Sequence, residues 1–214
     1  MAELIAYASR TGTQRNLAGL RTMGWRLLIS ASGVHRSEGF EDLGIALDNG
    51  AWSARDTGTY PDEMKRLFIR LVLAFGALAD WTVPPDIVAG GARSLALSLR
   101  WMTWVLRHCR RALIAVQDGM EVDQIRPYLG GDVGIFIGGS TAWKLATLAQ
   151  WADLARERGA WCHVARVNSP LRIRKCSLAG ATSFDGSNAS RYAVNQPKLG
   201  AAVAQQFFVL KRKS

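Results

Sequence analysis

Carboxylate and amide side chains stand where short apolar segments of this 214-residue sequence end. Asp48, Asp86 and Asp185 each close such a segment, and Gln117 closes another. Carboxylates gathered in one place take different roles, because repulsion and burial separate their pKa values. One of them can attack a sugar carbon while another moves the proton, as in retaining glycosyl transfer.

A flat, guanine-like base edge suits the other polar groups at these ends. Asp86 can accept two N–H groups, and the Gln117 amide and the bare backbone of Gly138-Gly139 supply further donors and acceptors. Trp52, four residues after Asp48, can stack on such a base. The alternatives are structural: strand ends attract Asp, Asn and Gly as turn formers, and Trp52 is equally well explained as a core or rim residue.

These residues converge only if the apolar segments are parallel strands. The pattern predicts strands at residues 4–8, 26–30, 44–48, 81–87, 113–117, 134–137, 161–167 and 182–185. Apolar periodicity and stop signals predict helices from Asn16, as a cap, to about Gly24, and over 64–75, 94–111, 122–129 and 142–158. Eight strands alternating with helix-sized connections predict an α/β protein with one minimal (β/α)8 TIM barrel over residues 1–214.

Proline marks the end of the fourth predicted strand. Pro84 and Pro85 cannot donate to a ladder, so pairing should stop near them and expose Asp86. Because chemistry in such barrels lies at the carboxyl ends of the strands, the polar end residues should meet at one mouth.

His163 falls inside the seventh predicted strand, where a hydrogen-bonded core residue is the favoured interpretation over a catalyst.

Positive charge is concentrated near Asp185. The formal net charge is +10, and residues 166–214 carry nine Lys or Arg side chains and only one acid, Asp185. This imbalance favours a polyanionic partner that comes close to Asp185. The expected backbone contacts are Arg172, Arg174, Lys175 and Arg191, with Arg10 in an early loop. Lys211-Arg212-Lys213, taken alone, is better explained as a solvated tail.

The cysteines and the apolar runs narrow the class of protein further. Cys109, Cys162 and Cys176 are widely spaced, which favours reduced thiols and makes a zinc site unexpected. The apolar run at 71–79 is far short of a membrane span, and the N-terminus lacks the pattern of a signal peptide. We therefore expect a cytoplasmic protein with no membrane partner.

Five segments resemble, in order, motifs of the tRNA-guanine transglycosylases and their phage and bacterial DNA-modifying relatives. They are Asp48-Asn49-Gly50-Ala51-Trp52, Asp86, Ala115-Val116-Gln117-Asp118-Gly119, Ile137-Gly138-Gly139 and Ser183-Phe184-Asp185. The set covers about residues 45 to 190. Each motif is weak alone, whereas the ordered set is specific. The resemblance implies that Asp185 is the nucleophile, that Asp48 is the general base, and that Asp86, Gln117 and the glycine pair read the base.

Departures from the family pattern bear on the substrate. The zinc module that the family's tRNA enzymes carry after the nucleophile has no counterpart here. Lys144 stands where those enzymes usually have a glutamate, Val88 replaces a cysteine, and Arg166 and Asn168 replace glycines. Because the zinc module helps to hold tRNA, the short form is more similar to the DNA-acting relatives, found in bacteria or phage-infected cells.

The resemblance implies a pentosyltransferase that exchanges guanine in DNA for a free 7-deazaguanine such as preQ0. No cofactor and no zinc are expected. A zinc-less tRNA enzyme is the first alternative, and a non-catalytic nucleic-acid-binding subunit is the second, from another class. A barrel enzyme acting on small metabolites is the remaining possibility. The choice of deazaguanine, the sequence context and the oligomeric state, whether monomer, homodimer or part of a larger complex, are left open by the sequence.

Overall fold

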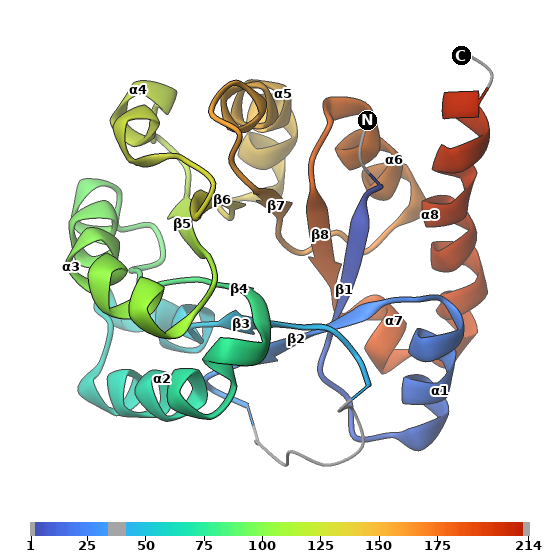
Figure 1. The fold of residues 1–214 in the computed structure, drawn as a ribbon, viewed down its shortest axis with the longest axis horizontal. Coiled ribbons are helices and arrows are strands. Elements are labelled where there is room, and N and C mark those ends of the chain that lie inside the picture. The colour runs from blue at the N-terminus through green and yellow to red at the C-terminus, as the bar shows by residue number, and fades with distance from the viewer. Residues whose placement is uncertain (1–2, 34–41, 212–214) are drawn as a thin grey trace.

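The computed structural model describes residues 3–33 and 42–211. Its eight strands are parallel and form a closed barrel in the order of the chain, with β8 pairing back to β1 (Figure 1). The strands are β1 (Ile5–Ser9), β2 (Arg26–Ser30), β3 (Ile45–Asp48), β4 (Ala79–Thr82), β5 (Ala112–Val116), β6 (Val133–Ile137), β7 (Cys162–Val164) and β8 (Ser183–Gly186). The predicted TIM barrel is therefore confirmed.

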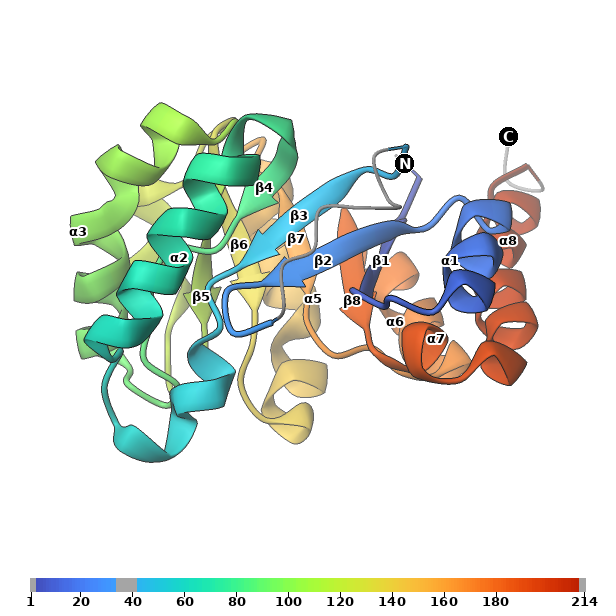
Figure 2. The ribbon, with the colours of Figure 1, turned by 90° about the horizontal axis from the view of Figure 1, so that it is seen from below.

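Helices follow the strands and surround the barrel. They are α1 (Gln14–Thr22), α2 (Asp62–Phe75), α3 (Ala92–His108), α4 (Val122–Ile125), α5 (Thr141–Glu157), α6 (Pro170–Ala179), α7 (Asn188–Arg191) and α8 (Gln196–Lys211). Short 3₁₀ helices cover η1 (Ala51–Thr57), η2 (Gly76–Leu78), η3 (Arg126–Tyr128) and η4 (Ala193–Asn195). Both views place α1, α7 and α8 together on one side, opposite α2 and α3 (Figures 1 and 2). No helix in the described ranges is long and apolar enough to cross a membrane.

Apolar strands explain why the barrel holds together. All five residues of β5 are buried, as expected for a parallel strand covered on both faces. One set of apolar side chains packs between the strands and the helices. A smaller cluster, centred on Tyr7, Trp81 and Leu113, gathers alternate residues of the strands and fills the barrel interior. His163 joins it, with its ring 4.4 Å from Trp81 and stacked 5.1 Å from Phe136.

Several element boundaries differ from the expectation. β4 ends at Thr82 rather than at residue 87, because Pro84 and Pro85 follow closely. The Asn16 cap is wrong: Thr13 precedes the helix, and Asn16 is buried within it, donating to the Ser190 carbonyl at 2.6 Å. Helices α6, α7 and α8 are additional to the predicted ones.

Candidate functional site

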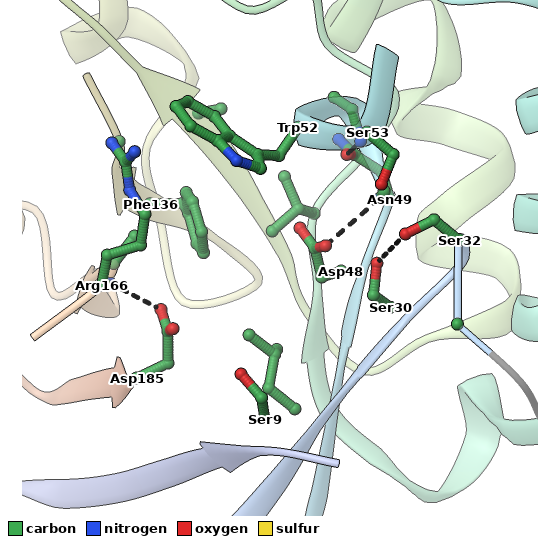
Figure 3. A pocket seen from close by; sticks show the side chains of 18 of the residues that line it. Ser9, Ser30, Ser32, Asp48, Asn49, Trp52, Ser53, Phe136, Arg166 and Asp185 are labelled. Carbon is green, nitrogen blue, oxygen red and sulfur yellow. Dashed lines mark hydrogen bonds between the residues drawn. The ribbon is translucent and has the colours of Figure 1, made fainter. Parts of the chain in front are cut away.

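A cavity of about 1090 Å³ lies at the carboxyl ends of the strands. Its lining includes all seven residues predicted for catalysis and base binding: Asp48, Trp52, Asp86, Gln117, Gly138, Gly139 and Asp185. In Figure 3 the side chains of Asp48, Asp185, Phe136 and Ser9, from four different strands, and that of Trp52, from η1, surround one open space. The cavity is large enough for a nucleoside-sized ligand.

A chain of hydrogen bonds leads to Asp185 from inside the barrel. His163 Nε2 lies 3.0 Å from Asp185 Oδ1, and His163 Nδ1 lies 2.8 Å from the Ser183 hydroxyl. The Trp161 indole donates to that hydroxyl at 2.7 Å. Burial lowers the pKa of His163, which favours the neutral ring. A carboxylate at Asp185 can only accept, so the neutral His163 ring donates to it from Nε2. The other ring nitrogen, Nδ1, then accepts a hydrogen bond from the Ser183 hydroxyl.

The turn after β7 supplies a second donor to Asp185. The Arg166 backbone N–H donates to Oδ1 at 3.2 Å, so both of these hydrogen bonds go to the same oxygen. Oδ2 accepts no hydrogen bond from a described residue and belongs to a side chain that lines the cavity. Asp185 thus presents one fixed oxygen and one open one, which is the arrangement a nucleophilic carboxylate needs.

Asp48, at the end of β3, is set up for proton transfer. Burial raises its pKa from 3.8 to about 6, and the charge of Asp185 acts in the same direction. Hydrogen bonds from Ser30 and from the Gly50 N–H, at 3.2 Å, oppose the increase. A carboxyl group whose pKa lies near neutrality can both release and accept a proton at working pH.

Asp86 forms a buried network with Asn49 and Gln117. The Asn49 amide donates to Oδ1 at 2.7 Å, and the Gln117 amide donates to Oδ2 at 2.9 Å. The expected exposure of Asp86 is wrong, since only 7% of the residue is accessible, although it still lines the cavity. Burial raises its pKa to about 7, while the hydrogen bond from Asn49 opposes the increase. Each carboxylate oxygen keeps a further lone pair for a ligand N–H.

Gln117 also holds the loop that follows β4. Its amide nitrogen donates to the Ile87 carbonyl at 3.0 Å, and its oxygen accepts from the Ala89 N–H. Ala89 has a left-handed backbone, with φ of +55°, so this hydrogen bond fixes a strained residue at the rim. With these partners Gln117 orients Asp86 and the loop, in addition to lining the cavity.

The two glycines after β6 differ in what they can offer. The Gly138 N–H donates to the Val116 carbonyl at 2.9 Å, which extends the β5–β6 ladder and engages this donor within the fold. The Gly139 N–H has no acceptor among the described residues. Gly139 has φ of +66°, and a Cβ there would lie 2.5 Å from Asp118 Oδ2 and 2.7 Å from Trp143. Glycine is therefore required at 139.

Trp52 stands at the rim rather than in the core. Trp52 is 52% exposed, and its position in η1 places the indole ring over the cavity. The Arg166 guanidinium lies 4.4 Å from the ring centroid, and that of Arg55 lies 5.2 Å away. Arg166 also donates to the Gly139 carbonyl and has φ of +58°, at a position where a glycine would be unstrained. Arg166 therefore joins Trp52 to the β6 turn across the mouth.

The predicted phosphate contacts divide into two groups. Of the five basic residues, all described, Arg10 lines the cavity, whereas Arg172, Arg174, Lys175 and Arg191 do not. Those four residues lie on α6 and α7, which follow β7 and β8. They are thus placed beside the strands that present Arg166 and Asp185. Arg212 and Lys213 of the expected tail lie outside the described residues.

Lys144 is a buried cation next to the site. It is 3% exposed, and its ammonium donates to the Ala165 carbonyl. Burial lowers its pKa to about 8, the neighbouring charge of Arg166 adds to the decrease, and Asp185 opposes it. The bond to Ala165 ties the first turn of α5 to the segment that places the Arg166 N–H against Asp185.

Some of these groups were not identified from the sequence. Asn49 contacts Asp86 directly, and Ser183 is connected to Asp185 through His163. Asn49 and Ser183 stand within two positions of predicted residues, which was the available signal. Within the described ranges, no group of three or more His, Cys, Asp or Glu side chains is arranged to hold a metal ion. The three cysteines are buried free thiols.

Comparison of the sequence with models of known protein families finds no match, and a search against curated proteins finds none either.

Proposed function

We propose that this protein is a base-exchange transglycosylase that replaces guanine in a nucleic acid with a free 7-deazaguanine. The observation that carries the proposal is the pairing of an open Asp185 oxygen with an Asp48 of raised pKa on one cavity, beside the Asp86 network. The first carboxylate is held by His163 and by a backbone N–H, and the second can exchange a proton at neutral pH.

In the first step, Asp185 Oδ2 attacks C1′ of the target nucleotide. The C1′–N9 bond breaks, its electron pair goes to N9, and the protonated form of Asp48 supplies the proton to the leaving guanine. The product is a sugar ester of Asp185 and a neutral free base. The donors from His163 and Arg166 hold Oδ1 in place while Oδ2 forms the new bond.

In the second step, the incoming 7-deazaguanine occupies the place that guanine left. The Asp48 carboxylate takes the N9 proton, N9 attacks C1′, and the ester bond breaks to return Asp185. Two displacements at one carbon restore the original stereochemistry. Asp48 recovers the proton that it gave in the first step, so no co-reactant is needed.

The polar ends of the successive strands are suited to a guanine edge. Asp86 accepts from N1–H and the 2-amino group through its free lone pairs, while Asn49 and Gln117 keep its orientation. The Gly139 N–H donates to O6, and Trp52 covers the base at the rim. Since the three carboxylates Asp48, Asp86 and Asp185 line one cavity, the bound base lies between Asp86, which reads its edge, and Asp185, the nucleophile.

We propose DNA before tRNA as the polymer, following the resemblance of the sequence motifs to those of the DNA-acting relatives. A base inside a duplex is out of reach, so the target is flipped out or single-stranded, at a cost of a few kcal/mol. Phosphate contacts by the basic residues on α6 and α7 offset part of that cost. The hydrogen bond that fixes Asp185 and the raised pKa of Asp48 favour an enzyme over a non-catalytic binding subunit.

The covalent intermediate tests the proposal. The protein is incubated with guanine-containing DNA or tRNA and quenched in acid, and the adduct is located by peptide mass spectrometry. We expect a sugar ester on Asp185, its loss in Asp185→Asn, and an unchanged yield in Asp132→Asn, which alters an exposed carboxylate away from the cavity. An adduct that persists in Asp185→Asn would assign the nucleophile to another residue.

A further inference from the structure

We infer that Arg166 selects which free base is inserted, by requiring a hydrogen-bond acceptor at position 7 of the base. This inference rests on the proposed base exchange and names the substrate class of the same site. Arg166 lines the cavity, contacts Trp52 at 4.4 Å and donates to the Gly139 carbonyl. That one hydrogen bond engages one of the several N–H donors of the guanidinium, and the fork is otherwise available to a ligand.

The order of the strands places position 7 of a bound base next to Arg166. Along the edge of a guanine, the N1 and 2-amino donors are followed by O6, then by position 7, and then by N9. Around the barrel, Asp86 after β4 is followed by Gly139 after β6, Arg166 after β7 and Asp185 in β8. A base that points its donors at Asp86 and its N9 toward Asp185 therefore presents O6 to Gly139 and position 7 to Arg166.

An arginine is a specific reader of this part of guanine. The guanidinium fork pairs with O6 and N7 at once, since both atoms are acceptors. A 7-deazaguanine has a carbon in place of N7 and so loses one of the two acceptors. A nitrile or carboxylate at position 7 restores it, whereas an aminomethyl group brings an ammonium against the guanidinium. Because one cavity must hold both the leaving guanine and the incoming base, a donor here suits a guanine and an acceptor-bearing deazaguanine alike.

The surroundings of Arg166 favour the same class of base. Lys144 adds a second cation beside it, because its ammonium binds the carbonyl of the preceding residue, Ala165. Asp118 is the nearby carboxylate that could instead attract an ammonium. Its two oxygens accept from the Ser140 N–H and hydroxyl, each at 2.6 Å, so its hydrogen-bonding capacity is partly used.

Binding of free bases to the whole protein tests the inference. The probes are guanine, 7-cyano-7-deazaguanine, 7-carboxy-7-deazaguanine and 7-aminomethyl-7-deazaguanine, measured by calorimetry at one pH. We expect the first three to bind at least about 10-fold more tightly than the aminomethyl base, in line with the discrimination of a good arginine pair. Arg166→Gly should reduce this ratio to about 1, and glycine suits the local φ of +58°. Arg55→Ala is the matched control, since Arg55 also lies over Trp52 but outside the cavity lining, and should keep the ratio.

The outcomes separate the inference from the proposed function. An unchanged ratio in Arg166→Gly, or tighter binding of the aminomethyl base by the unaltered protein, overturns the role of Arg166 and leaves base exchange standing. If the folded protein binds none of the four bases, the proposed function fails and this inference with it. Asp118→Asn tests whether the neighbouring carboxylate also sets the binding ratio. If this variant changes the ratio as much as Arg166→Gly does, Asp118 and Arg166 select the base together, and Arg166 alone does not.

Discussion

Three carboxylates on one cavity have different neighbours and so different chemistry. Asp185 is held on one oxygen by His163 and the Arg166 N–H. Asp48 has a pKa raised to about 6 by burial, and Asp86 has one raised to about 7 by burial within its amide network. At the scale of single residues, these differences match the three roles that the proposed function assigns, with Asp185 as nucleophile, Asp48 as proton carrier and Asp86 as base reader.

The raised pKa of Asp86 should be measurable as a pH-dependent loss of stability. Because the folded pKa, about 7, lies above the unfolded value of 3.8, the stabilising contribution is complete below about pH 4 and is lost as the pH rises through 7. Asp86→Asn has no titrating group at this position and avoids the loss. The free energy of unfolding of the variant minus that of the unaltered protein should therefore increase by roughly 2 to 4 kcal/mol from pH 4 to pH 8. Denaturant unfolding at several pH values measures this difference.

Taking the difference between the two proteins removes the effect of other groups. The buried His163 has a lowered pKa and acts in the opposite direction up to its unfolded value of 6.5. In Asp86→Asn, the amide that replaces the carboxylate faces donors from Asn49 and Gln117. This lowers the free energy of unfolding of the variant by an amount that does not vary with pH. A difference that stays constant from pH 4 to 8 would contradict the assigned pKa.

At the scale of elements, the site depends on two turns with left-handed residues that are not glycine. Ala89, after β4, has φ of +55° and is fixed by Gln117, and Arg166, after β7, has φ of +58° and supplies a donor to Asp185. Such conformations cost about 1–2 kcal/mol per residue and persist where the surroundings hold them. Both lie on the rim of the cavity, where strain is associated with function.

Glycine at position 89 should stabilise the protein. Ala89→Gly removes the left-handed strain, and the greater freedom of glycine in the unfolded chain offsets part of the gain, leaving about 0.5–1 kcal/mol. The same substitution at Ala149, which is exposed in the middle of α5, should instead destabilise by about 1 kcal/mol. Chemical denaturation of the two variants compares them directly. A loss of stability at both positions would show that Ala89 is not strained.

The elements show what could be predicted from the sequence and why. Short apolar runs ending in Asp or Gly are local signals, so the strands and the residues at their ends were identifiable. The contact of His163 with Asp185 depends on the register of β7 against β8, which pairs His163 with Ser183. Arg166 and Trp52 are 114 positions apart, and only closure of the barrel brings them together. The two glycines of the pair differ in a way that the sequence does not indicate, because the β5–β6 ladder continues one residue past the apolar run and engages the Gly138 N–H.

Helix α6 is indicated by the residues at its two ends and not by apolar periodicity. Ser169 caps it by accepting from the Arg172 N–H, Pro170 begins it, and Gly180 ends it in a left-handed conformation. These are ordinary start and stop residues, but Ile173 and Cys176 are its only buried side chains. A helix with so narrow a buried face gives little periodic pattern, so its caps were the better evidence.

At the scale of the whole molecule, positive charge is concentrated in the part of the chain that follows β7. The net charge is +10, and most of the excess follows residue 165. Four of the basic residues there, Arg172, Arg174, Lys175 and Arg191, lie on α6 and α7. Arg174 and Arg191 are exposed there. Salt-dependent affinity is the direct signature of phosphate contacts, because each contact releases bound counterions.

Removing this charge should change the salt dependence of binding. In Arg174→Ala/Arg191→Ala, the slope of log affinity against log salt should become shallower by about 1.4 to 1.8, the value for two phosphate contacts. Arg66→Ala/Arg70→Ala on α2 removes the same charge from exposed positions on the opposite side of the barrel and should keep the slope. Equal changes in both double variants would indicate a general charge effect in place of a defined binding face.

Transfer of a labelled base into a polymer tests the central claim most directly. The protein is incubated with radiolabelled 7-cyano-7-deazaguanine and either guanine-containing DNA or tRNA, and the label retained in each polymer is counted after removal of free base. The account predicts retained label with release of an equal amount of guanine, greater in DNA, and none in Asp185→Asn. Absence of label from both polymers with folded protein, or undiminished incorporation by Asp185→Asn, would contradict it.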